Sequence, residues 1–316
     1  MSIGQEVTNT PKPAPAKPVR RLADVIFAGT ARSSGILILL VLVGVAAFLI
    51  IEAMPAFTAD SKDIAGGKGF FSYIWPLVFG TAVSSIIAIV LATPVAIGIA
   101  LFISHYAPRK LAGPIGFVID LLAAVPSVVF GMWGLQVLAP QMGPVYKWLE
   151  NNLGWIPIFA QGSTTGRTIV TASIVLAVMI LPIITSVSRE VFLQTPTLHE
   201  EAALALGATR WEMIRTAVLP FGRPGIIGGI MLGLGRALGE TMAVAIILSP
   251  GAFTWALINS GNSTIPADIA LNFPEASGLK LNTLIAAGLV LFVITLIVNM
   301  IARYIVDRRR EFSGAN

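Results

Sequence analysis

Six long runs of apolar residues, separated by shorter polar segments, dominate the chain. They cover residues 35–51, 74–103, 114–138, 168–188, 224–248 and 281–305. Each run is close to or longer than the roughly 20 residues that a helix needs to cross the hydrocarbon core of a bilayer. The pattern therefore predicts an all-α, polytopic membrane protein with six transmembrane helices.

The 21 Lys and Arg residues are divided unevenly among the segments that connect these runs. If the N-terminus is inside, 15 of them lie in inside segments, five lie in outside loops, and Arg236 lies within a span. Membrane proteins concentrate basic residues in their cytoplasmic segments. We therefore expect both termini to lie in the cytoplasm.

The start of the chain is polar and rich in proline, with Pro11, Pro13, Pro15 and Pro18. This composition is typical of disorder, so residues 1–30 are expected to form a disordered cytoplasmic tail. The tail is too long, and the first apolar run too extended, for a typical cleaved signal peptide, so we interpret that run as an uncleaved span. The membrane domain then covers residues 31–310, and residues 311–316 form a second cytoplasmic tail.

The composition also excludes several kinds of site. The chain has no cysteine, which rules out disulfides, thiolate nucleophiles and cysteine-based metal sites. Because His105 and His199 are far apart in sequence, we expect neither a metal site nor catalytic residues. No G-x-x-x-x-G-K-S/T phosphate loop is present, so any ATP and Mg²⁺ must bind to another polypeptide, and we expect no cofactor in this chain. The net charge of +5 comes from short segments beside the apolar runs, and does not indicate a nucleic-acid partner.

Residues 189–223, between the fourth and fifth runs, do not have the composition of a linker. The segments TLHE, at residues 197–200, and TRWE, at residues 209–212, both have the spacing of a helix capping box. Gly207 lies between them as a helix terminator, and the second helix is expected to end before Pro220. The pattern predicts two short helices around a glycine break, and by itself it leaves open a connecting loop with no further role.

Two charged residues, Arg236 and Glu240, interrupt the fifth apolar run. Arg236 falls close to the midpoint of the run, where an unpaired charge costs about 2.5–3.5 kcal/mol on insertion scales, so it should face the bundle interior or a water-filled path. The i,i+4 spacing places both residues on one helix face, where they can neutralise each other. A purely structural ion pair and a role in the substrate path both remain open. Thr241 and, in the third run, Ser127 are further candidates for the path.

Other residues of the third and fifth apolar runs are suited to a break in a helix or to close packing between helices. Pro126 and Ser127 either break the third helix and expose backbone groups to a path, or only kink it. Two glycine pairs of the fifth run have the small-xxx-small spacing of tight helix interfaces, namely Gly229/Gly233 and Gly235/Gly239.

Residues 201–220, EAALALGATRWEMIRTAVLP, resemble the EAA signature of permease subunits of ABC importers, the MetI-like family. The matching positions are Glu201, Ala202, Ala203, Gly207, Leu219 and Pro220. The aliphatic position of the signature is Ala217 here, with Val218 beside it. The resemblance implies a coupling helix, to which Glu200 also belongs, that docks in a groove of a separate ATP-binding subunit and transmits nucleotide-driven movement to the membrane helices.

Two further segments of the sequence narrow the resemblance to one group of permeases within this family. GGIMLGLGRALGETMAV, at residues 228–244, and AAVPSVVFGMWGL, at residues 123–135, resemble PstC-type permeases of phosphate-specific ABC importers. The likeness covers roughly residues 30–310. It implies ATP-driven translocation of inorganic phosphate across a bacterial cytoplasmic (inner) membrane. It also implies three kinds of partner: a homologous PstA-type permease, a dimer of ATP-binding subunits, and a periplasmic phosphate-binding protein facing the outside loops at residues 139–166 and 249–280.

The charged residues of the fifth run fit this substrate chemically. An arginine presents a planar fork of donors that suits phosphate oxygens. A Glu240 carboxylate can accept a hydrogen bond from the P–OH group of phosphate, which fully ionised sulfate lacks. Three alternatives remain: a permease for another oxyanion such as sulfate or molybdate, an ATP-independent anion transporter or channel, and a structural membrane scaffold.

Overall fold

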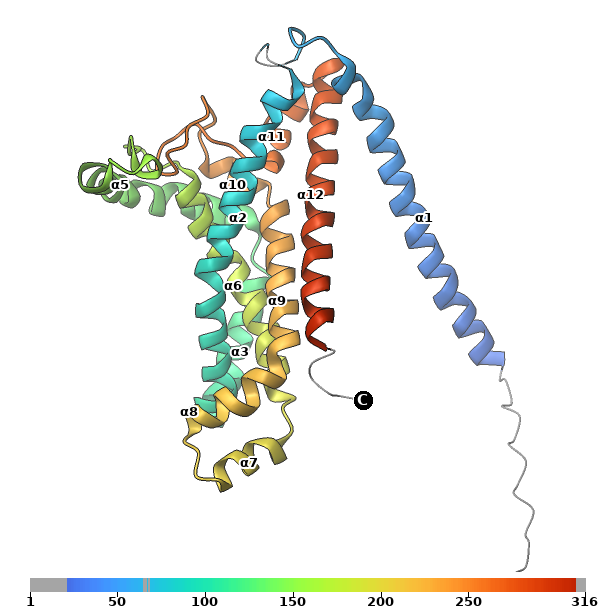
Figure 1. Cartoon of the computed structure of the whole chain (residues 1–316), viewed down its shortest axis with the longest axis vertical. Helices are drawn as coiled ribbons and strands as arrows, with labels where there is room; N and C mark the ends of the chain where they lie inside the picture. Colours follow the sequence, from blue (N-terminus) through green and yellow to red (C-terminus); the bar gives the residue numbers. More distant parts are fainter. Residues whose placement is uncertain (1–21, 65–66, 68, 311–316) are drawn as a thin grey trace, which may run out of the picture. The chain divides into compact units, whose positions relative to one another are not determined.

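The computed structural model describes residues 22–64, 67 and 69–310, and within them the regular structure is helical (Figure 1). A single isolated β-bridge, between Pro250 and Gly261, is the only β-contact in this part of the chain. Within these residues, five helices are long and apolar enough to cross a membrane, and the number is up to six if a bent pair of helices is one span. The predicted all-α, polytopic fold class is confirmed. The long helices are α1 (Leu22–Thr58), α2 (Phe70–Leu101), α6 (Ile169–Leu193), α9 (Leu219–Gly239) and α12 (Leu279–Arg310).

Helix α1 begins earlier than the sequence pattern predicts. Residues 22–30, which the pattern assigns to a disordered tail, already belong to this helix. Residues 1–21 and 311–316, the rest of the two predicted tails, lie outside the described residues. The chain divides into a first unit, residues 1–48, and a second, residues 49–316. In the first unit the described side chains of α1 are almost all exposed and mostly apolar, which suits contact with lipid.

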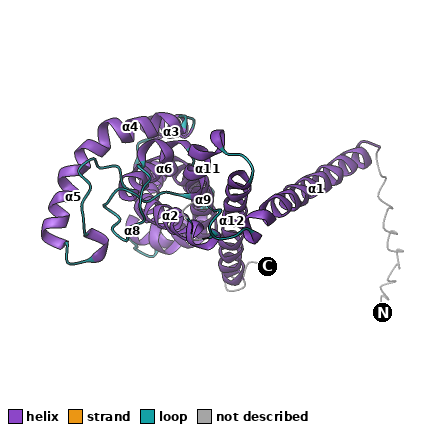
Figure 2. Ribbon diagram, turned by 90° about the horizontal axis from the view of Figure 1, so that it is seen from above, coloured by secondary structure: helices purple, strands orange, loops and turns teal. Residues whose placement is uncertain are grey.

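The core of the second unit lies between α2, α6 and α9. Figures 1 and 2 show these helices side by side, with α12 next to α9. Ala88, Ala92 and Ala96 repeat every four residues along α2 and are buried in the central apolar cluster. Small side chains at this spacing let helix backbones approach closely, which is how helices associate where lipid removes the hydrophobic driving force.

The two glycine pairs of α9 differ in their surroundings. A Cβ atom on Gly233 would lie 3.0 Å from Ile184 Cγ1 of α6, and one on Gly229 would lie 3.3 Å from Val187 Cβ. The first pair therefore forms the predicted tight interface. Gly235 and Gly239 have no such neighbour within 4 Å in the described chain, so the second pair packs against nothing in this subunit.

The third predicted span is broken. Helix α3 (Arg109–Ala123) ends before Pro126, which caps the start of α4 (Ser127–Trp133) with an extended ψ of 139°. The chain turns by 90° at this point, and the helix then runs on through α5 (Ala139–Leu153). The segment predicted as the third span, residues 114–138, is therefore not one straight helix, and of the two predicted outcomes at Pro126 and Ser127 the break is the one observed. Proline has no N–H for the helical ladder and disfavours helical backbone at the preceding residue, so Pro126 produces a break and not a simple kink.

The fifth span is shifted toward the N-terminus. A continuous helix covers Arg210–Gly239, made of α8 (Arg210–Met213), a π-helical turn (Ile214–Val218) and α9. The prediction that the helix ends before Pro220 is therefore wrong. Pro220 lies in the first turn of α9, directly after the π-helical turn, where the regular hydrogen-bond ladder is already interrupted and a missing N–H costs little.

The helix that precedes this span, α7 (Thr197–Ala205), projects from one end of the second unit (Figure 1). Its predicted capping box is absent, because Pro196 is the N-cap and Thr197 is already the first helical residue. Gly207 ends the helix as predicted, with a φ of +86° that favours glycine. The Ala208 amide donates to the Ala203 carbonyl at 3.2 Å, as in a Schellman motif.

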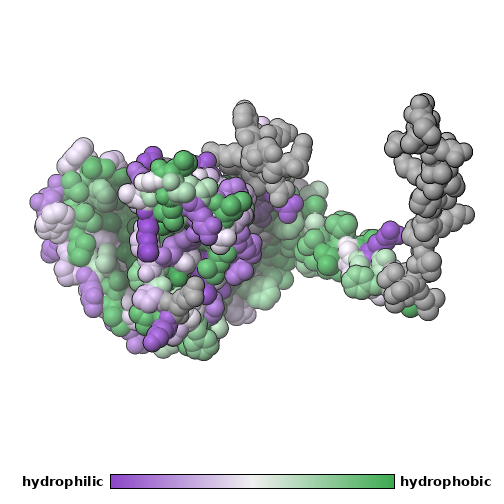
Figure 3. Space-filling model, turned by 90° about the horizontal axis from the view of Figure 1, so that it is seen from below, coloured by the Kyte–Doolittle hydropathy of each residue, from purple (hydrophilic) through white to green (hydrophobic). Residues whose placement is uncertain are grey.

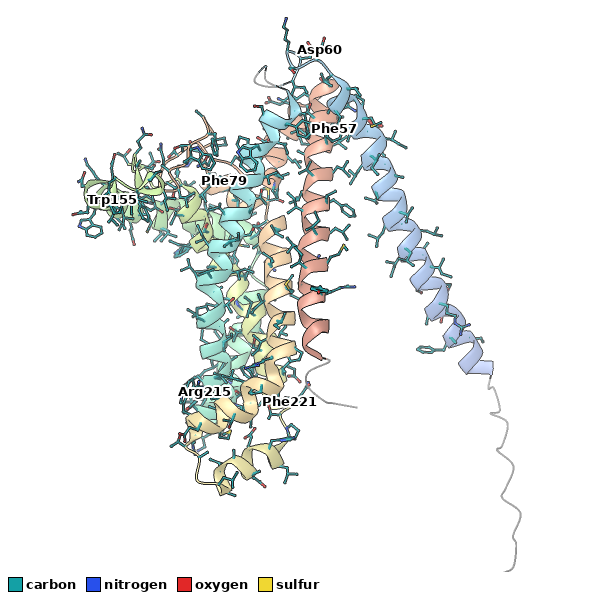
Figure 4. All side chains as sticks on the ribbon, in the orientation of Figure 1. Phe57, Asp60, Phe79, Trp155, Arg215 and Phe221 are labelled. Atoms are coloured by element: carbon teal, nitrogen blue, oxygen red, sulfur yellow. The ribbon has the colours of Figure 1, made fainter. Side chains whose placement is uncertain are left out.

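The second predicted box does form. The Thr209 amide donates to Glu212 Oε2 at 2.8 Å, and the Glu212 amide donates to Thr209 Oγ1 at 3.3 Å. Figure 4 labels Arg215 and Phe221 at the same end of the unit, where this helix enters the bundle. The glycine turn and the box together fix the angle between α7 and the long helix that follows.

The opposite end of the unit consists of α5, α11 (Ile265–Asn272) and long loops (Figure 2). The two predicted outside loops pack on each other there. The Ser163 amide donates to the Ile258 carbonyl at 2.8 Å, and the Leu257 amide donates to the Ile158 carbonyl at 3.0 Å. An edge-to-face aromatic cluster of Phe79, Phe253 and Trp255 fixes the second loop to α2.

Candidate substrate path and coupling element

The predicted ion pair in the fifth span is not formed. Helix α9 ends at Gly239, and Glu240 has an extended backbone with φ −69° and ψ 123°. Arg236 lies within the last turn of α9 and not near the midpoint of a span. Because Glu240 is outside the helix, the two residues do not share a helix face, and within the described residues no carboxylate lies within 4.0 Å of the Arg236 guanidinium.

Glu240 instead caps the start of a short helix, α10 (Met242–Ile247), from the position just before the N-cap residue Thr241. Its side chain is buried, and Oε1 accepts a hydrogen bond from the Ala243 amide at 3.2 Å. A carboxylate at this position satisfies one of the unpaired N–H groups of a helix start and interacts favourably with the helix dipole. The charge that looked like the partner of Arg236 therefore orients α10.

Arg167 caps the other end of α10. Its guanidinium donates to the carbonyl oxygens of Ile246 at 3.4 Å, Ile247 at 3.1 Å and Leu248 at 2.7 Å. Cations at a helix C-terminus are favourable. No local pattern indicates this role, because Arg167 lies 81 residues from Leu248 along the chain, and by sequence it is only a basic residue of an outside loop.

The two breaks in the membrane helices lie in contact. Helix α10 packs on α4, and a Cβ on Gly131 of α4 would lie 2.8 Å from the Cα of Ala243. Ser127 is the first residue of α4, one turn before Gly131. The structure therefore brings the helix that begins at Ser127 against the helix that Glu240 caps.

Thr241 borders an open groove at the same break. The groove has a volume of about 480 Å³, and its lining includes Gly239, Thr241, Pro266 and Phe273. Arg236 is half-buried one turn before it on α9. Three of the four predicted path residues, Ser127, Glu240 and Thr241, thus lie at two adjacent helix breaks. The fourth, Arg236, lies one turn before the second break, with no carboxylate within 4.0 Å in the described part of the chain.

The predicted coupling residues gather at the α7 end. Glu201 and Ala202 are exposed, whereas Ala203 packs against the apolar cluster that contains Ile214 and Val218. Of the two residues at the end of the signature, Leu219 joins the same cluster, and Pro220 is exposed. One face of α7 therefore rests on the bundle through a small side chain, while Glu201 and Ala202 are free to meet a partner.

This end of the unit also exposes large apolar side chains. Leu198 is 73% exposed, Leu206 is 90% exposed and Trp211 is 56% exposed. Figure 3 views the molecule from this side and shows hydrophobic and hydrophilic residues intermixed over the surface. These large apolar side chains at the projecting end are therefore accessible for contact with another protein.

One contact of α7 was not predicted. His105, in the π-helical turn Phe102–Tyr106 that follows α2, places Nε2 at 3.4 Å from Glu200 Oε1. It is the only His-, Lys- or Arg-to-carboxylate contact within 4.0 Å among the described side chains. The only signal in the sequence is that both residues belong to segments predicted at the same membrane face.

A family profile described as "Binding-protein-dependent transport system inner membrane component" matches residues 92–311. The match covers more than half of the chain and includes both helix breaks and the EAA segment. The chain belongs to this family.

Curated relatives of this family member share its sequence along nearly its whole length. Phosphate transport system permease protein PstC 2 of Mycobacterium tuberculosis is 48% identical over 303 residues, which are 92% of this chain and 93% of the relative. PstC of Mycobacterium leprae is 49% identical over 82% of this chain and 86% of the relative. PstC of Mesorhizobium japonicum is 40% identical over the full length of both chains.

Solved structures share the fold at low sequence identity. A chain of a bacterial ABC transporter involved in the import of the acidic polysaccharide alginate has a TM-score of 0.55 and 19% identity, over 89% of this chain and 98% of that chain. A chain of the MetNI methionine ABC transporter has a TM-score of 0.51 and 17% identity, over 76% of this chain and 95% of that chain. The fold is therefore that of ABC transporter permeases, and this family member is a membrane protein with several spans.

Proposed function

We propose that this chain is the permease subunit of an ATP-driven ABC importer that moves inorganic phosphate across the bacterial cytoplasmic membrane. The observation that carries the proposal is the 40–49% identity to relatives named as phosphate transport permeases, over 82–100% of this chain. The chain itself would perform no bond chemistry, and ATP with Mg²⁺ would bind to a separate subunit.

We further propose that the α7 end faces the cytoplasm and docks on a dimer of ATP-binding subunits. The 15 basic residues in segments assigned to the inside support this orientation. The exposed face of α7, with Glu201 and Ala202, would enter the groove of the ATP-binding subunit. The opposite end, with the packed outside loops, would then receive a periplasmic phosphate-binding protein. A second permease of the PstA type would complete the membrane part.

We place the phosphate path beside the two helix breaks. Arg236 would offer its donor fork to the phosphate oxygens. Ser127 and Thr241, at the starts of α4 and α10, would offer hydroxyl groups. Glu240 would keep α10 in place through the Ala243 amide, and it would also accept a hydrogen bond from a protonated phosphate oxygen. A displacement of α7 would reach this region through the continuous helix 210–239.

Uptake of radiolabelled phosphate at low external concentration tests this proposal. The chain and its Arg236→Gln variant are each expressed with their partner subunits in cells without a high-affinity phosphate importer, at equal membrane abundance. We expect the parent to restore uptake and the variant to lose it. If the variant loses uptake, Arg236 belongs to the path or its gate. If both chains take up phosphate equally, Arg236 has only a structural role.

The same cells separate phosphate from other oxyanions. Labelled sulfate and molybdate are offered to the parent and to Glu240→Gln. A parent that imports sulfate or molybdate in place of phosphate contradicts the proposal. If Glu240→Gln discriminates phosphate from sulfate as well as the parent does, Glu240 acts only as the cap of α10.

A further inference from the structure

The helix of residues 127–153 runs across the second unit and not along it. It consists of α4, a π-helical turn (Gly134–Leu138) and α5, and it makes an angle of 90° with α3. Figure 2 looks onto this end of the unit and shows α4 and α5 along its edge, outside α2 and α6. Because α3 packs on the membrane-spanning helix α6, helix 127–153 lies close to the plane of the membrane.

The depth of α5 follows from its attachment to α6. The Tyr146 hydroxyl of α5 lies 2.7 Å from the Thr171 hydroxyl, in the first turn of α6. From Thr171 to Arg189, near the other end of α6, the helix rises about 27 Å. That rise is close to the roughly 30 Å thickness of the hydrocarbon core of a bilayer. Since arginine side chains near helix ends reach toward the membrane edge, α5 lies near the opposite edge.

Helix α4 begins deeper in the membrane than α5. Helix α3 starts with Arg109 and Lys110, two cations that suit the membrane edge on the α7 side. Over its length α3 rises about 22 Å, which is less than the hydrocarbon thickness. The break at Pro126 therefore lies inside the far edge of the hydrocarbon, and residues 127–138 contain no charged side chain. The helix thus begins in hydrocarbon and reaches the boundary at α5, where Lys147 is its first charged residue.

One side of this helix forms an exposed apolar row, which we call the apolar stripe. Its members are all exposed and recur along the helix from α4 to α5; they are Val129, Met132, Trp133, Val137, Val145 and Trp148. Scattered exposed apolar residues are ordinary on a protein surface, whereas a large continuous patch marks contact with another molecule or with a membrane. We therefore expect the stripe to be covered.

The opposite side of the helix packs on this chain. A Cβ on Gly134 would lie 2.8 Å from Ile247 Cδ1 of α10, and one on Gly143 would lie 2.7 Å from the Thr164 carbonyl oxygen. Tyr146 is fully buried. The bundle and the loop after α5 thus cover one side from end to end, and whatever covers the stripe lies outside the second unit.

Lipid fits both the depth and the chemistry of the stripe. Next to its α4 end, Phe117 and Leu121 of α3 are also exposed, at a depth where lipid is the surrounding medium. At its α5 end lies Trp148, which is 60% exposed, and Trp155 follows just after the helix. Tryptophan is enriched at the boundary between a membrane and water. The apolar surface therefore continues from a membrane-crossing helix to a pair of exposed tryptophans.

We propose that helix 127–153 is an interfacial helix, which lies in the membrane plane at the edge opposite α7 and rests its apolar stripe on lipid. Trp148 and Trp155 lie at the level of the lipid headgroups. Lys147 and Asn151, exposed on another side of α5, face water. The helix is thus a support in the membrane plane and not the second half of a span, and this placement does not depend on which ion is transported.

Nitroxide labels measure the depth of the helix in the membrane. The chain has no cysteine, so a label attaches only at an introduced site. Val129→Cys, Val145→Cys and Lys147→Cys are labelled one at a time in the complete complex, in lipid nanodiscs. Collisions with dioxygen, which concentrates in lipid, and with a water-soluble nickel chelate give the depth of each label. We expect the Val145 label about 5–10 Å inside the boundary between headgroups and acyl chains, the Val129 label deeper, and the Lys147 label in water.

A label at Gln141 repeats the measurement at a polar site. Gln141 is exposed one turn before Val145, so Gln141→Cys removes no apolar contact, and its label should lie at the depth of the Val145 label. If the nickel chelate reaches the Val145 label as readily as the Lys147 label, the stripe faces water and the proposal is overturned. If neither reagent reaches the Val145 label, another protein covers the stripe, and the proposal is overturned as well.

A matched pair of charges tests the lipid contact itself. Trp148→Asp places a carboxylate on the stripe, and Asn151→Asp places one on the side that faces water. With the label at Gln141, we expect Trp148→Asp to move the label toward water, because a charge is costly in lipid, whereas Asn151→Asp leaves its depth unchanged. A label that stays at the same depth in Trp148→Asp, or moves equally in both variants, contradicts the proposal.

Discussion

At the scale of single residues, Glu240 shows how a charge in an apolar run acquires a role. The carboxylate accepts a hydrogen bond from the Ala243 amide, while Arg167 binds the carbonyls at the other end of α10. The negative charge of Glu240 lies at the positive end of the dipole of this six-residue helix, and the positive charge of Arg167 lies at its negative end. Both interactions are favourable. These two residues, from distant parts of the sequence, therefore stabilise a helix that is too short to be stable alone.

Removing the cap should cost stability in a graded way. Glu240→Ala leaves the Ala243 amide without an acceptor in a buried place, so the free energy of unfolding should fall by about 0.5–2 kcal/mol. Glu240→Gln keeps an acceptor oxygen and should lose less. Thermal unfolding of the purified chain in detergent measures both. Equal stability of the Ala variant and the parent would show that the cap contributes nothing.

Asp268 of α11 should make stability depend on pH. Its carboxylate accepts hydrogen bonds from the Tyr73 hydroxyl and the Asn272 amide, the latter at 3.1 Å. Burial raises the pKa of Asp268 above its ordinary value, although the hydrogen bond from Tyr73 and the charge of Lys280 oppose the rise. A raised pKa means that the folded state binds the proton more tightly than the unfolded state. The contribution of Asp268 to stability is thus greatest at low pH and falls as pH rises from about 3.9 through the folded-state pKa.

The variant Asp268→Asn removes this titration and retains an oxygen that accepts from Tyr73. It should be at least as stable as the parent near neutral pH, and its midpoint of thermal unfolding should vary less with pH on the acidic side. Asp60→Asn, at an exposed position, serves as the matched control. The same dependence on pH in the parent and in Asp268→Asn would contradict the assignment.

At the scale of elements, the contact between α4 and α10 depends on a glycine. A Cβ at Gly131 would meet the backbone of Ala243 at 2.8 Å, and backbone cannot move aside as a flexible side chain can. Gly131→Ala should therefore separate the two short helices. We expect a loss of about 1–3 kcal/mol, the usual cost of overpacking, and a loss of phosphate uptake if the path lies beside these helices.

Gly235→Ala is the matched control, since no described atom beyond its own stretch of helix lies within 4 Å of the added methyl group. Alanine is about 0.5–1 kcal/mol better than glycine inside a helix, so this variant should be as stable as the parent or more so. Thermal unfolding of the purified chain compares the two. If both substitutions lowered the stability by a similar amount, contact of the added methyl group with α10 would not be the cause of the loss in Gly131→Ala.

At the scale of the whole molecule, its two ends should bind different partners. Leu206 is 90% exposed at the α7 end, and Trp155 is 80% exposed at the opposite end, where Figure 4 labels it. Leu206→Asp should abolish co-purification with the ATP-binding subunits and leave the stability of the chain unchanged. Trp155→Asp should retain those subunits. Loss of the ATP-binding subunits from Trp155→Asp, or their retention in Leu206→Asp, would contradict the assignment of the two ends.

The sequence by itself determined the class of fold and the local features that depend on neighbouring residues. Apolar runs of bilayer length predicted the membrane helices, because a helix in lipid must satisfy its own backbone and needs an apolar surface. The Thr209 box and the Gly207 turn were also predicted, since each is decided within a few residues. A neighbouring residue can still override such a local pattern. The cap expected at Thr197 does not form, because Pro196 takes the N-cap position.

Only the tertiary structure decided which residues act together. Helical periodicity placed Arg236 and Glu240 on one face, but α9 ends between them, and Glu240 turns to the Ala243 amide. Arg167 reaches α10 across 81 residues, and His105 reaches Glu200 across 95. Such contacts depend on where the helix breaks point the chain, and packing between distant segments selects that direction. The apolar pattern locates the membrane helices along the chain, but it contains no information on this direction.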